Sequence, residues 1–194
     1  MVCLPTAAGT EGAERIRYWI DLGVAHFSKL GVEWAEGLPV VDHASANNEA
    51  FAKRIAEANF VYLSGGKPPY LYQSLAGTPV WEAILGVLER GGVVAGCSAG
   101  AMIFGERLLS GPGRMEAANG FGYLHKAYVI PHFDELPAVM VQGAALLLRA
   151  WTMVGIDGYT ALVAGPDGLS VRGRGRVEIR SNGGKRVVRE GEKL

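Results

Sequence analysis

Residues 93–102 read Val-Val-Ala-Gly-Cys-Ser-Ala-Gly-Ala-Met, and this stretch says most about the architecture of the chain. Its first four residues are apolar or small, which is typical of a short buried strand. Residues 96–100, which share Gly96 with this strand, match the pattern Gly-x-Ser-x-Gly. This pattern indicates a nucleophilic serine only where it joins a strand to a helix, because a sharp turn then exposes the serine at the edge of a sheet. The context therefore predicts an α/β sheet with Ser98 at the end of one strand.

Apolar runs and helical periodicities alternate on both sides of this stretch, which is the pattern of an α/β protein. The strands expected besides 93–96 are 2–5, 31–34, 60–63 and 127–130. The helices expected are one over 13–27, one that begins after Asn47 or Asn48, two between 69 and 90, and one over 138–154. Strands joined by helices in this way pair in parallel, so a mostly parallel sheet flanked by helices follows.

The last quarter of the chain has a different pattern. Short apolar runs at 160–164, 169–171, 177–179 and 187–188 are separated by turn residues, and Asn182-Gly183 is a strong hairpin signal. We therefore expect a C-terminal antiparallel hairpin at the edge of the parallel sheet. A length of 194 residues suits one domain, so residues 1–194 are expected to form a single domain with 160–194 as its short antiparallel extension.

Composition excludes several classes of protein. With 49% hydrophobic and 20% charged residues the chain can bury a core, so disorder and a coiled coil do not fit. Nineteen basic and nineteen acidic residues cancel, which removes the usual electrostatic reason for binding nucleic acid or an anionic membrane. Residues 171–194 nevertheless hold eight basic and three acidic residues, a local net charge of +5 that we interpret as a solvated face.

Cysteine content and the N-terminus bear on the compartment. Two cysteines, Cys3 and Cys97, are too few for a disulfide framework or a zinc site. No run approaches eighteen apolar residues, and the first residues lack the pattern of a signal peptide. These features predict a cytoplasmic protein.

Ser98 is the first candidate for chemistry. A strand-to-helix turn this sharp strains the backbone at its tip and needs small flanking residues, and the serine hydroxyl then projects beside free N–H groups of the helix. Gly96 and Gly100 can also be explained by close packing of a strand against a helix alone. Cys97 is a rival nucleophile, but it precedes the tip and should point elsewhere.

Several ordered segments resemble one known family. Residues 60–66 (Phe-Val-Tyr-Leu-Ser-Gly-Gly) and 94–101 resemble motifs of the peptidase E and cyanophycinase family of serine peptidases, family S51. Residues 129–134 (Val-Ile-Pro-His-Phe-Asp) and 155–162 are similar to its histidine and late acidic segments, and Leu4-Pro5-Thr6-Ala7 also fits. The matches run in the family's order over roughly positions 2–165. The resemblance implies a class I glutamine-amidotransferase-like three-layer sandwich.

The resemblance also implies roles for two residues, with Ser98 as nucleophile and His132 as general base. His132 ends a predicted strand, at the sheet edge where ligand-facing loops gather. Histidine suits the role because it changes protonation state near neutral pH. His26, His43 and His125 lie in no comparable motif.

The acid that orients the base is where this sequence departs from the family. Relatives commonly carry Asp-Glu where this chain has Asp157-Gly158. Three substitutes are open: Asp157 itself, Asp134 two residues after the base, and Glu116 in the preceding loop. We favour Asp157, although a shift of one residue in an extended segment reverses the direction of the side chain.

A glycine pair supplies candidate oxyanion donors. Gly65 or Gly66, after a predicted strand, can turn an N–H toward a ligand, and the N–H of Ala99 follows the nucleophile. Lys67 either meets a substrate carboxylate or lies in solvent. No dinucleotide or phosphate-loop motif is present, and no metal or cofactor is implied.

These features together predict a serine exopeptidase for small peptides, nearer the peptidase E (dipeptidase E) branch. The resemblance implies acidic Asp-X or isopeptide substrates. A non-catalytic ligand-binding or regulatory module of the same fold, and a Ser–His amidase or acyltransferase on a non-peptide substrate, remain alternatives. The expected partner is a small peptide, not nucleic acid or a membrane, and the sequence leaves a monomer or a homodimer open.

Overall fold

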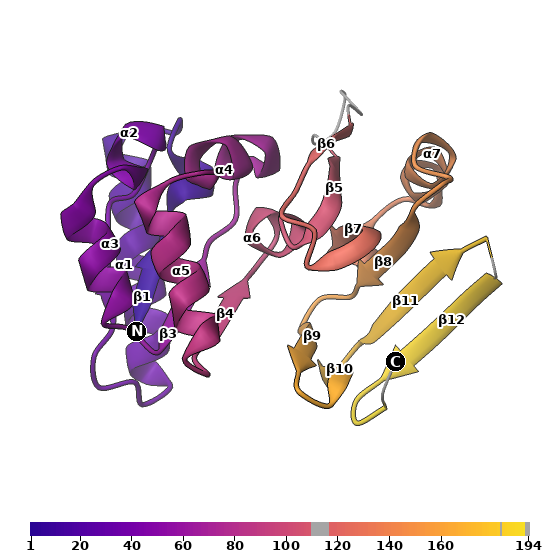
Figure 1. The fold of residues 1–194 in the computed structure, drawn as a ribbon. Helices are drawn as coiled ribbons and strands as arrows, with labels where there is room; N and C mark the ends of the chain where they lie inside the picture. Colours follow the sequence, from indigo (N-terminus) through magenta and orange to yellow (C-terminus); the bar gives the residue numbers. More distant parts are fainter. Residues whose placement is uncertain (110–116, 183, 193–194) are drawn as a thin grey trace. The chain divides into compact units, whose positions relative to one another are not determined.

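The computed structural model describes residues 1–109, 117–182 and 184–192 (Figure 1). The chain divides into two compact units, Met1–Ala101 and Met102–Leu194, each with its own sheets. The expectation of a single domain over residues 1–194 stays a prediction.

The first unit is built on a four-stranded sheet in the order β2-β1-β3-β4. All three strand pairings are parallel. Val61 and Leu63 of β3 are completely buried, as is expected of central strands covered on both faces. The bounds are β1 (Val2–Leu4), β2 (Glu36–Gly37), β3 (Phe60–Leu63) and β4 (Val93–Gly96).

Helices flank this sheet. The helix α1 contacts β1 and β2, whereas α5 contacts β3 and β4. The starts of two helices follow from capping, since the side chain of Asn48 accepts a hydrogen bond from the Ala50 N–H and that of Thr78 from the Trp81 N–H. The bounds are η1 (Thr6–Ala8), α1 (Ala13–Lys29), α2 (His43–Ala46), α3 (Glu49–Ala56), α4 (Pro68–Leu75), α5 (Pro79–Glu89) and α6 (Ala99–Met102).

The second unit contains a six-stranded mixed sheet in the order β12-β11-β8-β7-β5-β6. Its strands β5, β7 and β8 are parallel, and the other neighbours pair antiparallel. A separate antiparallel pair is formed by β9 and β10. The bounds are β5 (Gly105–Leu109), β6 (Ala117–Asn119), β7 (Leu124–Pro131), β8 (Thr152–Ile156), β9 (Thr160–Gly165), β10 (Gly168–Gly173), β11 (Arg176–Ser181) and β12 (Gly184–Arg189).

The core of the second unit lies between this sheet and two helical segments, η2 (Phe133–Glu135) and α7 (Ala138–Leu147). Phe133 packs directly over the sheet, because a Cβ placed on Gly155 would lie 2.5 Å from its ring. The buried residues of this core are Leu109, Tyr128, Ile130, Phe133, Val141, Ala144, Leu148 and Met153.

The expected fold class is confirmed: a parallel sheet flanked by helices, with antiparallel strands at the C-terminus. The hairpin expected around Asn182 is the β11–β12 pair. None of the helices in the described ranges combines the length and the apolar character that crossing a membrane requires.

Two expected elements differ from the structure, and strand β5 is an additional element. The helix expected over 138–154 ends at Leu147, and 152–156 form β8 instead, where Val154 is β-branched and buried between two neighbouring strands. The strand expected at 31–34 is a two-residue strand at 36–37. Strand β5 was not expected, and it leaves α6 with only four residues.

Candidate active site

Ser98 lies at the tip of the turn between β4 and α6, and its φ of 50° is in the left-handed region. This conformation costs a non-glycine residue about 1–3 kcal/mol and persists only where its surroundings impose it. The flanking glycines impose it here. A Cβ on Gly96 would lie 2.3 Å from the Gly100 carbonyl oxygen, and one on Gly100 would lie 2.2 Å from that of Leu63. The two explanations of Gly96 and Gly100 therefore both apply: these glycines allow close packing, and the turn between them holds Ser98 in a strained conformation.

The glycine pair after β3 lies beside this turn, within the first unit. A Cβ placed on Gly65 would be 3.2 Å from the Ser98 Cβ and 3.6 Å from its Oγ. Gly66 has a φ of 145°, and a Cβ on it would be 2.3 Å from the Ala7 carbonyl oxygen. Gly65 therefore lies against the Ser98 side chain, whereas Gly66 lies against the Ala7 backbone, where a side chain would not fit.

Backbone N–H groups next to Ser98 are available to a ligand. The N–H groups of Ser64 and Cys97 are bonded to the Leu4 and Leu63 carbonyl oxygens, both at 3.1 Å. In contrast, no acceptor within residues 1–109, 117–182 and 184–192 is paired with the N–H of Gly65, Gly66 or Ala99. Unpaired N–H groups around a serine can stabilise an oxyanion.

Two other side chains flank this part of the site. The ammonium of Lys67 is exposed and donates to the Thr10 hydroxyl at 2.9 Å. Cys97 is an exposed free cysteine. Burial raises the pKa of the Tyr62 phenol, and a hydrogen bond with the Cys97 thiol raises it further.

His132 directly follows β7, in the second unit, and its φ of 52° is also left-handed. Its backbone begins η2, where its carbonyl oxygen accepts the Glu135 N–H at 3.0 Å. The neighbouring ring of Phe133 is buried over Gly155 and fixes this turn to the sheet. The imidazole itself is exposed and forms no hydrogen bond with the described residues.

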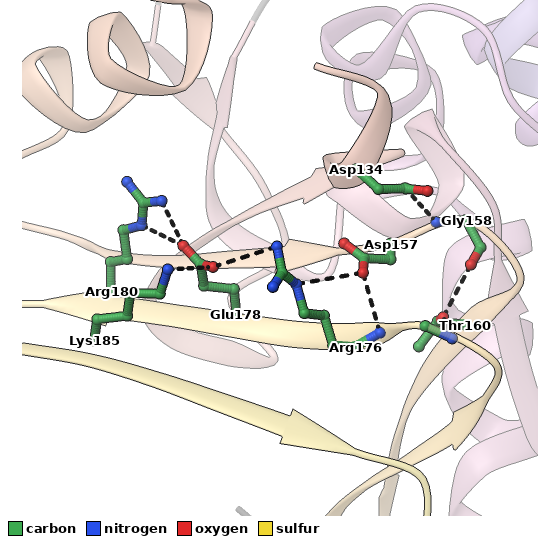
Figure 2. Close-up of polar contacts among 9 residues, drawn as sticks. Asp134, Asp157, Gly158, Thr160, Arg176, Glu178, Arg180 and Lys185 are labelled. Carbon is green, nitrogen blue, oxygen red and sulfur yellow. Dashed lines mark hydrogen bonds and ion pairs between the residues drawn. The ribbon is translucent and has the colours of Figure 1, made fainter. Parts of the chain in front are cut away.

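Asp157 lies at the same sheet edge as His132. Pro131 and Ile156 are paired across β7 and β8, so the two residues follow neighbouring parallel strand ends. The Asp157 carboxylate, however, lies against Arg176 of β11, as Figure 2 shows. Its Oδ2 accepts the Arg176 backbone N–H at 3.2 Å and lies 3.5 Å from Nε of that guanidinium. The structure brings these two residues to adjacent positions without a hydrogen bond between them.

Each member of the Asp157–Arg176 pair also carries an unsatisfied atom. Within the described part of the chain, the buried Oδ1 of Asp157 and the buried Nε of Arg176 have no hydrogen-bond partner. A buried carboxylate oxygen without a donor is costly, by about 1–3 kcal/mol. Oδ1 of Asp157 is therefore free to accept a hydrogen bond from a further donor.

The structure describes one of the two alternative acids, Asp134, but not the other. The Oδ1 of Asp134 accepts the Gly158 N–H at 2.7 Å, so this carboxylate joins η2 to the segment after β8 (Figure 2). Glu116 lies outside the described residues.

Sequence reasoning missed the charged cluster on β11 and β12. Glu178 is 1% exposed, and its carboxylate lies 2.5 Å from Arg180, 2.8 Å from Lys185 and 4.0 Å from Arg176 (Figure 2). Burial tends to raise the pKa of Glu178, but the hydrogen bonds from Lys185 and Arg180 outweigh this effect and hold it below its usual value. The local excess of basic residues was the one available signal.

In the part of the chain that the structure describes, His, Cys, Asp and Glu side chains nowhere gather in groups of three that could hold a metal ion.

Comparisons with known proteins identify the family of the chain. The model of peptidase family S51 matches residues 1–165. Cyanophycinase from Synechococcus elongatus is 31% identical over an alignment of 164 residues that covers 79% of this chain and 51% of that protein. The chain thus spans about half the length of the curated cyanophycinases that it matches.

Two solved structures are similar. A peptidase from an acI-B1 actinobacterium has a TM-score of 0.86 at 34% identity, over 100% of this chain and 82% of that one. A putative peptidase E from Listeria monocytogenes EGD-e has a TM-score of 0.67 over 89% of this chain and 85% of that one; at 18% identity it supports the fold alone. With the family match over 165 of its residues, the chain belongs to peptidase family S51.

Proposed function

We propose that this chain is a serine peptidase that hydrolyses small peptides through an acyl-enzyme on Ser98. The observation that carries the proposal is the left-handed Ser98 in a strand-to-helix turn, followed by Ala99 and next to the Gly65-Gly66 turn, whose N–H groups have no acceptor among the described residues. An alcohol and a set of oxyanion donors are what acyl transfer requires.

The proposed reaction has two halves. Ser98 Oγ attacks the scissile carbonyl carbon while His132 takes the hydroxyl proton, and His132 then gives that proton to the leaving amine as the C–N bond breaks. Water, deprotonated by the same imidazole, hydrolyses the ester and regenerates Ser98. The Ala99 N–H, with that of Gly65 or Gly66, stabilises both tetrahedral oxyanions.

Asp157 is proposed as the acid that orients His132. Two observations support it: the register that places the two residues after adjacent strand ends, and the buried Oδ1 that lacks a donor. An imidazole N–H would satisfy that oxygen while Oδ2 stays with Arg176.

The substrate is proposed to be a dipeptide or similarly small peptide. Membership of family S51 supports this choice, and the fold is shared with a putative peptidase E. Lys67 is proposed to meet a substrate carboxylate, because the described residues offer its ammonium only the uncharged hydroxyl of Thr10. The cytoplasmic location expected from the sequence stays a prediction.

Labelling with a fluorophosphonate tests the proposal directly. The wild type should be modified at Ser98, as located by peptide mass mapping, and should cleave members of a dipeptide library. The variant Ser98→Ala should neither be labelled nor turn over.

A non-catalytic binding module is the second candidate. It is favoured by one observation, the Asp157 carboxylate that lies against Arg176 instead of His132. A binding module would leave the wild-type serine unlabelled and every dipeptide intact, so the same experiment separates the two functions.

A further inference from the structure

Arg176 lies opposite Asp157, where β8 and β11 meet. The antiparallel register pairs Val177 with Ile156, and one step beyond that pair the Asp157 N–H donates to the Arg176 carbonyl oxygen at 3.1 Å. In return, the Arg176 N–H donates to Oδ2 of the Asp157 carboxylate at 3.2 Å. The backbone of β11 therefore holds this carboxylate, and the contact does not depend on the side chain at position 176.

The guanidinium of Arg176 adds a positive charge to this backbone contact. Its Nε lies 3.5 Å from Asp157 Oδ2 but forms no hydrogen bond within the described part of the chain, so it acts as a nearby charge. Its Nη2 lies 4.0 Å from Glu178 Oε2, and Figure 2 shows the guanidinium between the two carboxylates. Because the Asp157 side chain is only 11% exposed, water screens this charge less than it would at the surface.

Other charged groups surround this contact. Besides His132 after β7, they come from η2, β11 and β12 and are Asp134, Glu135, Glu178, Arg180, Lys185 and Arg189. Arg180 and Lys185 are paired with Glu178, at 2.5 and 2.8 Å. In the described ranges, the one ion pair of Asp157 is with Arg176. Arg176 is therefore the residue whose charge acts on Asp157 most directly.

We propose that Arg176 is a positioning residue for the reaction and acts on His132 through Asp157. The inference rests on the proposed function, with Asp157 as the orienting acid. The β11 backbone fixes Oδ2, the guanidinium keeps a positive charge on that side of the carboxylate, and Oδ1, which has no donor among the described residues, is left for the imidazole. Arg176 lies beyond residue 165, where the family match ends, so that match does not include it.

The charge of Arg176 has a definite effect on how the acid and the base take up a proton. An ionised Asp157 and a neutral His132 together form one coupled site for a proton. A nearby cation disfavours protonation of this site, whichever of the two groups takes the proton. Removal of the cation should therefore move the acidic limb of the activity profile to higher pH, and a variant that keeps a cation should leave the limb in place.

The test compares three variants of the full chain on a dipeptide that the wild type cleaves, from about pH 5 to pH 9, a range that spans the titration of histidine. Arg176→Met should lower kcat at least about tenfold, leave KM within about threefold, and move the acidic limb upward by at least about half a pH unit. Arg176→Lys should keep kcat within about threefold, with the limb unmoved. The matched control Arg172→Met removes a cation from an exposed pair with Glu190 and should change neither quantity.

A fourth variant shows whether Arg176 acts through the acid. In the Asp157→Asn background, Arg176→Met should lower kcat by less than about twofold, because the carboxylate on which the cation acts is already absent. An equally large loss in both backgrounds would overturn the inference. Arg176→Gln, which is neutral and polar, replaces Arg176→Met if urea unfolding shows that the latter has lost its cooperative fold, and the same shift is then required.

Fluorophosphonate labelling of Ser98 separates failure of the inference from failure of the proposed function. An unlabelled, inactive wild type would overturn both. With a labelled, active wild type, unchanged kcat in folded Arg176→Met would overturn the inference alone. A loss of kcat without movement of the acidic limb would do the same, because a merely structural role of Arg176 lowers the amount of active protein and leaves its pH profile unchanged.

Discussion

The turn at Ser98 holds a non-glycine residue in a conformation that it rarely adopts, and a carbonyl group packs against each of its flanking glycines. Backbone strain of this kind is a better indication of a functional residue when the side chain of the strained residue is also accessible to a ligand. Ser98 meets that condition, since it is only half-buried and lies among unpaired N–H groups.

The first prediction concerns Ser98 and His132 as one catalytic unit. Ser98→Ala and His132→Ala should each remove nearly all turnover, and the double variant should be no worse than either single variant, because losses within one unit do not add. The measurement is kcat for all three, with circular dichroism to confirm folding. Normal activity of Ser98→Ala, or a double variant much slower than both singles, would exclude this pair.

The second prediction concerns Cys97, the neighbouring nucleophile. Cys97→Ser should keep kcat within about threefold of wild type, because Cys97 precedes the tip of the turn, and the pKa of the neighbouring Tyr62 phenol is raised, so that this phenol is no base for the thiol at neutral pH. The check is activity before and after thiol alkylation. If Cys97→Ser and alkylation both abolished turnover, the cysteine would be the nucleophile.

The third prediction ranks the candidate acids. Asp157→Asn should lower kcat by about 10⁴, because an amide stabilises the wrong imidazole tautomer. Asp134→Asn should be milder, since its carboxylate serves the Gly158 N–H, and Glu116→Gln should be mild as well. The rank order of the three kcat values is the result that matters.

Arg176 supplies the control for the acid. Arg176→Lys should retain more activity than Arg176→Met, because a cation is kept beside Asp157 Oδ2. If Asp157→Asn stayed within tenfold of wild type while another acid variant collapsed, the orienting acid would lie elsewhere in the chain.

At the level of elements, the β11–β12 hairpin holds the most deeply buried charge, Glu178. The strand carries Arg176, Glu178 and Arg180 on one face at a period of two, and Lys185 of β12 is paired with Arg180. A carboxylate buried this far remains ionised only because three cations surround it.

The fourth prediction is that Glu178→Gln destabilises the protein by about 1–2 kcal/mol at pH 7, a modest figure because Arg180 and Lys185 are partly exposed. The folded-state pKa of Glu178 is lowered, so its contribution is complete above the ordinary carboxyl pKa and disappears as pH falls through the folded value. Urea unfolding at pH 7 and pH 3 measures this. The difference between wild type and variant should shrink at pH 3.

An exposed ion pair provides the matched control. Glu36→Gln, which removes one of the two carboxylates paired with Arg54 on the surface, should change stability by less than about 0.5 kcal/mol at pH 7. An equal effect of the two substitutions would mean that burial of Glu178 adds nothing.

Elements with strong local signals could be predicted, and elements fixed by distant partners could not. Asn48 and Thr78 cap their helices through their own side chains, so the starts of α3 and α5 are visible in the sequence. Strand β8 is different: its apolar residues continue the helical run of α7, and only pairing with β7 and β11 makes them extended.

At the level of the whole molecule, the same distinction applies to the candidate site. Ser98 and the glycine pair are local turns with recognisable residues, and His132 follows a strand with a clear pattern. The Asp157–Arg176 contact joins residues nineteen positions apart through antiparallel pairing of β8 and β11. Neither segment alone contains a sequence pattern that predicts this contact.

The family match ends at residue 165, yet the second unit depends on strands beyond it. Val177 of β11 and Val188 of β12 are almost completely buried. Strand β11 pairs with β8 along the edge of β8 that β7 does not occupy. These strands therefore belong to the fold of the unit that carries His132 and Asp157.

The fifth prediction follows from that dependence. A chain that ends at residue 165 keeps every proposed catalytic residue but exposes the edge of β8 and loses Arg176, so it should lose the cooperative unfolding of the second unit and at least 10³-fold in kcat. The measurements are urea unfolding and turnover, with a chain ending at Glu192 as control. If the short chain kept cooperative unfolding and near-normal kcat, β11 and β12 would contribute neither to the fold nor to the position of Asp157, and the acid would have to be oriented by β7 and β8 alone.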